Sequence, residues 1–209
     1  MCEATRGVYQ IGFVLRYCQS IQTIAELAPR LGTPALCRVS IFDEILDRNN
    51  RAHSKHFASQ FGHHASGFAR RGFFALWNAS PFVSAHATAM QTESDFNGPN
   101  IWSAQLSTAD GSVLEIEVGW LLPSLPPSTI SVVGPNGYAQ LDMNSGQGVY
   151  SHGGKIEKIS AGPLLQNWRR QLNVFAQAID EGEAKIATVE DGLRALTSTI
   201  ACEESCKTG

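Results

Sequence analysis

Residues 101–120 read IWSAQLSTADGSVLEIEVGW, and this stretch decides the fold class. Two runs of alternating residues flank Asp110-Gly111, a pair typical of tight β-hairpins because glycine readily adopts the positive φ that such a turn needs. In the second run, apolar residues at every other position share one face, and Glu115 and Glu117 lie on the other. The stretch therefore predicts two paired strands of a sheet with one dry face and one partly wet face.

Further strand patterns lie on both sides of this hairpin. Asn136-Gly137 marks a second hairpin of the same kind. Runs rich in β-branched and aromatic residues predict the remaining strands, at residues 8–16, 35–42, 81–90, 129–133, 138–143, 149–150 and 155–159.

Helical patterns are segregated from most of the strands. An apolar stripe predicts a helix after Ser20, its expected N-cap, up to Gly32. Residues 62–78 and 164–181 predict two more, and a last helix begins at Val189 behind Thr188, whose partner Asp191 completes a capping box. Residues 43–60 are polar and predict a long loop. This order predicts one α+β domain over residues 1–209, with helices packed on one face of a sheet.

Composition excludes several classes of protein. The chain has 209 residues and a net charge of −3, without the basic clusters that nucleic-acid binding needs. No apolar run approaches the ~20 residues of a membrane span, and no signal peptide precedes the domain. The five cysteines contain no CxxC pair, which predicts free thiols in a reducing compartment. We therefore expect a soluble, cytoplasmic protein that binds neither nucleic acid nor membrane.

Four segments resemble the C-terminal domain of the Gfo/Idh/MocA oxidoreductases, the family of glucose-fructose oxidoreductase and inositol dehydrogenase. They occur in the family's order and span nearly the whole chain: GVYQIGFVLRY (7–17), PNIWSAQLSTADGSVLEIEVGW (99–120), TISVVGPNGYAQLD (129–142) and NVFAQAIDEGEAKIATVEDGLRAL (173–196). The resemblance implies a large open, mainly antiparallel sheet with helices on one face. It also implies a homodimer through the sheet's free face, because that face often forms the dimer contact in the family.

Three features of the family have no counterpart in these 209 residues. No GxGxxG loop lies between a strand and a helix, as a dinucleotide-binding domain requires. No Glu-Lys-Pro segment supplies the family's lysine. The family's His-x-x-Asp signature would fall on residues 61–67, where Ser66 follows His63 and Gly67 follows His64 at the aspartate position. Without that carboxylate an imidazolium is less stabilised, so we expect no NAD(P)-dependent hydride transfer by this chain alone, and no bound cofactor.

Histidines gather in and just after the polar loop. His53, His56, His63 and His64 lie within twelve positions, near Asp47. One interpretation is a small-molecule site in which His63 and His64 act as acid and base and the other three bind substrate. The alternatives are a metal site with Asp47 as a fourth ligand, or a polar loop without a ligand. We carry the small-molecule site forward and expect no metal, and the polar loop without a ligand stays an open alternative.

Arginine and aromatic residues complete the predicted site. The resemblance places Arg16 and Tyr17 toward the substrate cleft, where an arginine binds a carboxylate or enolate oxygen bidentately. The alternative for Arg16 is a structural ion pair with a carboxylate such as Asp43 or Glu44. Trp77 and Trp102 are candidate substrate platforms, although a tryptophan is more often part of the core.

Three hypotheses for function follow. The first is a cofactor-independent enzyme, a cyclase, isomerase or lyase that binds a largely apolar small molecule in a biosynthetic pathway. Catalysis, including a pericyclic step, would then rest on substrate orientation and on a few hydrogen bonds. The second is the substrate-binding and oligomerisation half of an NAD(P)-dependent oxidoreductase. The third is a non-catalytic binding module.

Overall fold

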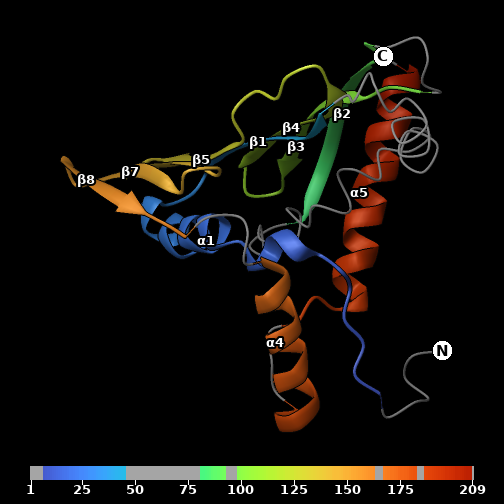
Figure 1. The fold of residues 1–209 in the computed structure, drawn as a ribbon. Helices are drawn as coiled ribbons and strands as arrows, with labels where there is room; N and C mark the ends of the chain where they lie inside the picture. Colours follow the sequence, from blue (N-terminus) through green and yellow to red (C-terminus); the bar gives the residue numbers. More distant parts are fainter. Residues whose placement is uncertain (1–6, 46–80, 93–97, 163–166, 183–185, 209) are drawn as a thin grey trace.

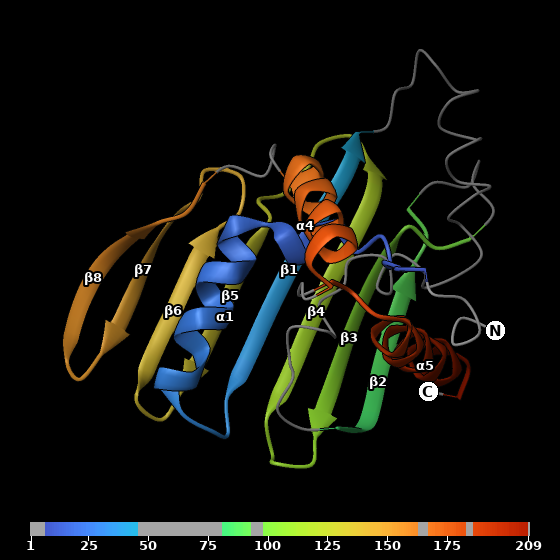
Figure 2. The same ribbon diagram turned by 90° about the horizontal axis from the view of Figure 1, so that it is seen from below.

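A computed structural model describes residues 7–45, 81–92, 98–162, 167–182 and 186–208. It contains one sheet of eight strands in the order β2-β3-β4-β1-β5-β6-β7-β8 (Figure 2). Neighbouring strands run antiparallel, except that β1 and β4 run parallel. The strands are β1 (Leu36–Ile45), β2 (Phe82–Met90), β3 (Ile101–Thr108), β4 (Val113–Leu122), β5 (Thr129–Gly134), β6 (Gly137–Asp142), β7 (Gln147–His152) and β8 (Lys155–Ser160).

The described helices lie on one side of this sheet (Figure 1). Helix α1 (Gln19–Leu31) packs on β5 and β6, and α5 (Val189–Thr208) packs on β2. Helix α4 (Asn167–Glu181) contacts the short 3-10 helix η2 (Val14–Tyr17) and projects away from the sheet (Figure 1). The α+β fold, with a mainly antiparallel open sheet and helices on one face, is therefore confirmed.

The core lies between the sheet and its helices. Leu106, Leu114, Ile116 and Val118 are almost fully buried on the covered face. Between them Glu117, on the other face, is exposed to solvent. The alternation of β4 thus separates a dry face from a wet one, as the sequence predicts.

Both predicted hairpin turns are present. Gly111 has φ +83° and follows Asp110, whose carboxylate accepts a hydrogen bond from the Ser112 amide. Gly137 has φ +145°, and a Cβ there would meet the Ser151 carbonyl oxygen on β7. At the second turn, glycine therefore serves both the backbone conformation and the close approach of a neighbouring strand.

The ends of the two C-terminal helices also follow the sequence. The Thr188 amide donates to Asp191 Oδ2 at 2.9 Å, and the Asp191 amide donates to Thr188 Oγ1 at 3.2 Å. These reciprocal bonds form the predicted capping box at the start of α5. Helix α4 ends at Glu181 and is followed by Gly182, which has φ +72°, the left-handed conformation that commonly stops a helix.

Two predictions near the N-terminus are wrong. Residues 8–16 form no strand: the Phe13 and Val14 amides donate to carbonyls two residues earlier, and the Ile11 amide donates to Ala187 O. The alternating pattern did predict burial correctly, since Phe13 and Leu15 are buried. The backbone of this segment, however, bonds to residues close in sequence and forms the 3-10 helix η2 instead of pairing with a neighbouring strand. Ser20 does not cap α1 either, because the N-cap is Cys18, two residues earlier, and Ser20 is buried within the helix.

The polar loop starts later than predicted. Strand β1 continues to Ile45, pairing with Leu122 of β4, so residues 43–45 belong to the sheet. The rest of that loop, and the predicted helix at 62–78, lie outside the described residues.

Candidate functional site

Most of the predicted site cannot be placed. The candidate acid–base residues His63 and His64 lie outside the described residues, as do four candidate binding residues, Asp47, His53, His56 and Trp77. Arg16, Tyr17 and Trp102 are described. The structure brings Arg16 and Tyr17 together in η2 and places Trp102 on β3.

Arg16 forms a structural ion pair. Its Nη1 lies 2.7 Å from Asp191 Oδ2 and 3.4 Å from the Ile186 carbonyl oxygen. The two charged side chains retain only 14% and 15% of their accessible surface. The Arg16 Nε is buried and has no hydrogen-bond partner among the described residues. The pair connects η2 to the first turn of α5. The sequence suggested a structural ion pair for Arg16, but with Asp43 or Glu44 as the partner; the partner in the structure is Asp191.

The carboxylate of this pair has a shifted pKa. Burial on its own would raise the pKa of Asp191, but hydrogen bonds from Arg16 and from the Thr188 amide favour the charged form, and they outweigh burial. The pKa of Asp191 therefore lies below its ordinary value of 3.8. The group stays ionised at neutral pH and holds the Arg16 guanidinium in place.

Tyr17 and Trp102 are both core residues by burial. Tyr17 is 3% exposed, and its hydroxyl accepts a hydrogen bond from Gln10 Nε2. Trp102 is 6% exposed within the core cluster. Their roles as substrate contacts stay predictions.

Two of the described thiols, Cys37 and Cys202, are unsuited to nucleophilic chemistry. Cys18, Cys37, Cys202 and Cys206 are all free. Burial raises the pKa of Cys37 to about 12 and that of Cys202 to about 11. The thiolate is the reactive form of cysteine, so these two behave as small apolar core residues.

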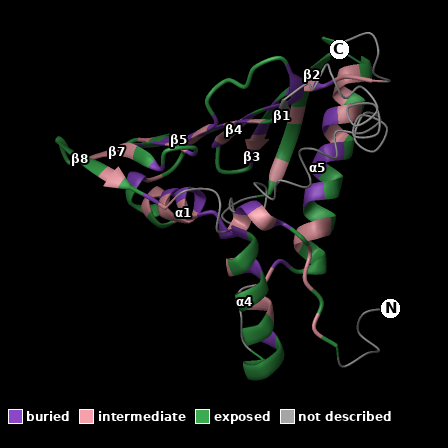
Figure 3. Ribbon diagram, viewed as in Figure 1, coloured by how far each residue is buried: buried purple, intermediate pink, exposed green. Residues whose placement is uncertain are grey.

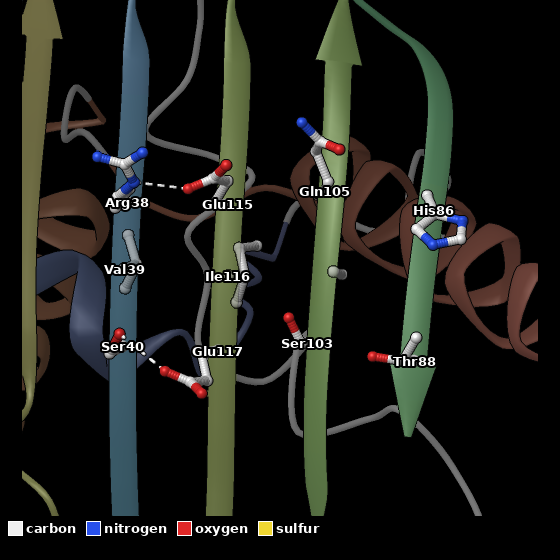
Figure 4. A pocket seen from close by; sticks show the side chains of 11 residues that line it. Arg38, Val39, Ser40, His86, Thr88, Ser103, Gln105, Glu115, Ile116 and Glu117 are labelled. Carbon is white, nitrogen blue, oxygen red and sulfur yellow. Dashed lines mark hydrogen bonds and ion pairs between the residues drawn. The ribbon is translucent and has the colours of Figure 1, made fainter. Parts of the chain in front are cut away.

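A polar groove of about 460 Å³ lies on the open face of the sheet, over β1, β4, β3 and β2 (Figure 4). Its polar side chains form two rows that cross the four strands, because each residue pairs in register with the next. The first row is Arg38, Glu115, Gln105 and His86, and the second is Ser40, Glu117, Ser103 and Thr88.

The groove has charged and neutral hydrogen-bonding groups side by side. Arg38 Nε donates to Glu115 Oε2 at 2.6 Å, and Ser40 Oγ donates to Glu117 Oε2 at 3.3 Å (Figure 4). The Arg38 and Glu115 side chains are 56% and 40% exposed. An open surface of this kind suits a polar ligand or a protein contact better than chemistry that must exclude water. We refer to these eight residues as the open-face groove.

Only part of this groove was predictable from the sequence. The alternation in residues 113–120 placed Glu115 and Glu117 on the wet face. Nothing in the sequence indicated that Arg38 and Ser40 lie opposite them, because that depends on the parallel pairing of β1 with β4.

Within the described part of the chain, no three His, Cys, Asp or Glu side chains gather as a metal site would require. Among the same residues, no helix is both long and apolar enough to cross a membrane.

The comparisons with known proteins find the fold in solved structures. No protein-family model matches the chain, and no curated protein matches it. An inositol dehydrogenase homologue from Azotobacter vinelandii, complexed with NADH and myo-inositol, superposes with a TM-score of 0.79 at 10% identity, over 100% of this chain and 64% of that one.

Two further structures show the same likeness. UDP-N-acetylglucosamine 3-dehydrogenase GnnA from Acidithiobacillus ferrooxidans has a TM-score of 0.71 and 13% identity, over 93% of this chain and 60% of that one. GenD2 from gentamicin A biosynthesis, in complex with NAD, has a TM-score of 0.70 and 18% identity, over 95% and 60%. At these identities the likeness establishes a shared fold, and the fold expected from the resemblance to Gfo/Idh/MocA oxidoreductases is confirmed.

The chain spans about three-fifths of the length of these structures, 60% to 64%. More than a third of each of these three proteins therefore has no counterpart in these 209 residues.

Proposed function

We propose that this chain is the substrate-binding part of an NAD(P)-dependent oxidoreductase. One observation carries the proposal: nearly the whole chain superposes on an inositol dehydrogenase homologue bound to NADH and myo-inositol, and on GenD2 bound to NAD. This favours the second of the three hypotheses. The first, a cofactor-free cyclase, isomerase or lyase, gains no support. Where the name of a similar protein states an activity, that activity is dehydrogenase or oxidoreductase.

The nucleotide would be bound elsewhere. The 209 residues contain no GxGxxG loop between a strand and a helix. More than a third of the length of the similar dehydrogenases lies outside the part that this chain matches. A dinucleotide-binding domain, on another polypeptide or on a further segment of the same one, would therefore supply the hydride acceptor. The present chain would orient the substrate and exclude water at its side of the cleft.

For the substrate we propose a polyol or a sugar derivative rather than an apolar molecule. Two similar structures carry myo-inositol or UDP-N-acetylglucosamine in their names. Hydroxyl-rich ligands suit the polar residues of the predicted site, where His63 and His64 would move the hydroxyl proton and Asp47, His53 and His56 would bind neighbouring hydroxyls. Arg16 would act by holding η2 against α5, and Tyr17, Trp77 and Trp102 remain proposed contacts or supports.

The test measures ligand binding and turnover separately. Titration calorimetry with myo-inositol and with UDP-N-acetylglucosamine should give millimolar or tighter binding to the chain, weakened in His63→Ala and His64→Ala. NADH alone should not bind. Adding a dinucleotide-binding domain should permit NAD(P)-dependent oxidation of the bound ligand. Turnover of an unsaturated substrate by the chain without any nucleotide would restore the cofactor-free hypothesis.

Two further properties belong to this proposal. A homodimer through the open face would join polar surfaces, because the groove over β1 to β4 carries charged and hydroxyl side chains. Residence in the cytoplasm is consistent with four free thiols, which persist in a reducing compartment.

A further inference from the structure

The two edges of the sheet differ in how they are covered. At one edge, helix α5 packs on β2, and the Ala87 amide donates to Ser205 Oγ of that helix at 3.1 Å. At the other edge, β8 pairs with β7 on its inner side and with no described strand on its outer side. Figure 3 shows β8 at the rim of the molecule, coloured as exposed over most of its length. An uncovered edge strand presents N–H and C=O groups to which a further strand can pair.

The turn before β8 determines which backbone groups point outward. Gly153 and Gly154 have φ +59° and +77°, as in the two-residue type I′ turns of tight hairpins. A turn of this type is closed by a hydrogen-bonded pair of residues, here His152 and Lys155. Bonded and non-bonded pairs alternate along an antiparallel ladder. Ile156 therefore lies in a non-bonded pair and directs its own N–H and C=O away from β7.

Strand β8 also carries charges that its own sheet does not match. Lys155, Glu157 and Lys158 are exposed, and none of them forms an ion pair with a described residue. Opposite them on β7 lie His152, Tyr150 and Val149. Lysines on an edge strand usually discourage pairing. An incoming strand that places a carboxylate opposite a lysine removes that obstacle, because opposite charges across a strand pair stabilise it.

A second copy of β8 supplies such a strand in one register. Two copies related by a two-fold axis perpendicular to the sheet pair antiparallel, with the axis at the same residue of each copy. With the axis at Ile156, Lys155 of each copy lies opposite Glu157 of the other. With the axis at a charged residue, identical charges lie directly opposite each other, which destabilises the pair. With the axis at Ile159 or Ser160, no opposite charges meet within the strand.

We propose that β8 pairs edge to edge with β8 of a second copy, about a two-fold axis at Ile156, so that two sheets become one. The outward N–H and C=O of Ile156 then exchange hydrogen bonds with those of the second copy. The two Ile156 side chains, each 68% exposed in the single chain, meet on one face of the sheet. The Lys155–Glu157 pairs lie on the other face, because successive side chains of a strand alternate. Lys158 lies opposite Gly154 of the second copy, which has no side chain to obstruct it.

This contact is separate from a dimer through the open face, and it should be weaker. It joins one short strand of each copy, which is less than the roughly 800 Å² per partner of a stable interface. We expect a Kd of about 1 mM, so that about half of the molecules are paired at ~1 mM and only about a tenth at ~50 µM. Concentration therefore separates edge pairing from a stable dimer.

The test is sedimentation equilibrium at ~1 mM and low ionic strength, where charge pairs are least screened. All proteins carry Ser103→Arg, which adds bulk and charge to the open-face groove and so opposes contact through that face. We expect this parent to have a mean mass about 1.5 times that of the monomer. Lys155→Glu and Glu157→Lys each place like charges opposite one another twice. Each variant alone should associate at least about tenfold more weakly.

An equimolar mixture of the Lys155→Glu and Glu157→Lys proteins is the decisive sample. In a mixed pair, both positions again have opposite charges across the contact, so the mixture should recover most of the mass increase of the parent. Lys158→Glu is the matched control, because it makes the same change of charge on the same strand but lies opposite Gly154. Its association should stay within about threefold of the parent.

Three results would overturn the proposal. The first is a mixture that associates no more strongly than either variant alone. The second is a loss with Lys158→Glu as large as that with Lys155→Glu, which would indicate a general effect of net charge. The third is a parent protein that remains monomeric at ~1 mM, about the expected Kd. Circular dichroism of each variant checks that these exposed substitutions leave the fold intact.

Discussion

Arg16 Nη1 and Asp191 Oδ2 lie 2.7 Å apart, across 175 positions of the chain. The same carboxylate accepts the Thr188 amide in the capping box of α5. One side chain therefore begins a helix and attaches it to η2. The contact contributes to the fold at the place where the predicted arginine site and the C-terminal helical segment meet.

Asp191→Asn should destabilise the protein by about 1–3 kcal/mol, because a partly buried, charge-assisted hydrogen bond is replaced by a neutral one while the cap is retained. Urea unfolding followed by circular dichroism measures the change. Glu115→Gln is the control, since its pair with Arg38 is 40–56% exposed and should contribute less than about 1 kcal/mol. Equal losses in the two variants would contradict a special role for Asp191.

The contribution of Asp191 should depend on pH. Because its pKa is lower in the folded protein than the ordinary 3.8, the stabilisation is present above that value and is lost as the pH falls through the folded pKa. The stability gap between wild type and Asp191→Asn should thus be full above about pH 5 and shrink steadily below pH 4. A gap that stays constant down to pH 2 would show that the charge is not its source.

Gly137→Ala should be among the most destabilising single-methyl additions, by more than about 2 kcal/mol, because it combines a strained φ with a collision of Cβ and a backbone carbonyl. Gly153 has φ +59° and open space around the position of a Cβ. Gly153→Ala should cost only about 1 kcal/mol, the price of the backbone conformation. Thermal unfolding of both variants compares them, and equal effects would show that strand contact plays no part.

The buried thiols should not react in the native protein. With pKa values of about 12 for Cys37 and about 11 for Cys202, neither forms an appreciable thiolate at pH 8. Labelling with an aromatic disulfide, followed by mass spectrometry of peptides, should modify both only after denaturation. Native labelling of Cys37 within minutes would show that β1 opens readily.

If the protein forms a homodimer through the open face, substitutions in the open-face groove should weaken the dimer. Ser103 lies in the second row and is exposed, so Ser103→Arg would add bulk and charge at the centre of the contact. We expect light scattering at ~50 µM, well above the Kd of a stable dimer, to give a dimer for wild type and a monomer for the variant. Ile156→Glu serves as the control, and a wild-type monomer would refute this mode of assembly.

Local patterns predicted most of the fold. Period-two alternation and the turns at Gly111 and Gly137 identified the strands to within a few residues, and the capping box at Thr188 identified the start of α5. These signals work because each is made by residues close in sequence. The pattern of residues 8–16 led to a wrong prediction because Phe13 and Leu15 are buried in the core without belonging to the sheet.

Long-range relationships could not be predicted in this way. The Arg38–Glu115 pair depends on the register of β1 with β4, and the partner of Arg16 is 175 positions away. The apolar residues Trp168, Leu172 and Ile179 of α4 recur at helical spacing, but periodicity alone assigns such residues to a core. In the structure all three are exposed, which the pattern could not predict.

The position of β1 has a consequence for how the protein acquires its structure. Strands β2 to β4 and strands β5 to β8 are each series of sequential neighbours, and β1 is inserted between β4 and β5. Neighbouring strands within each series are joined by short loops and can pair early, whereas β1 must pair in register with β4, 77 residues away, and with β5, 89 to 97 residues away. Its insertion should therefore be the late, rate-limiting step of folding, and substitutions such as Val39→Ala should slow folding as well as speed unfolding.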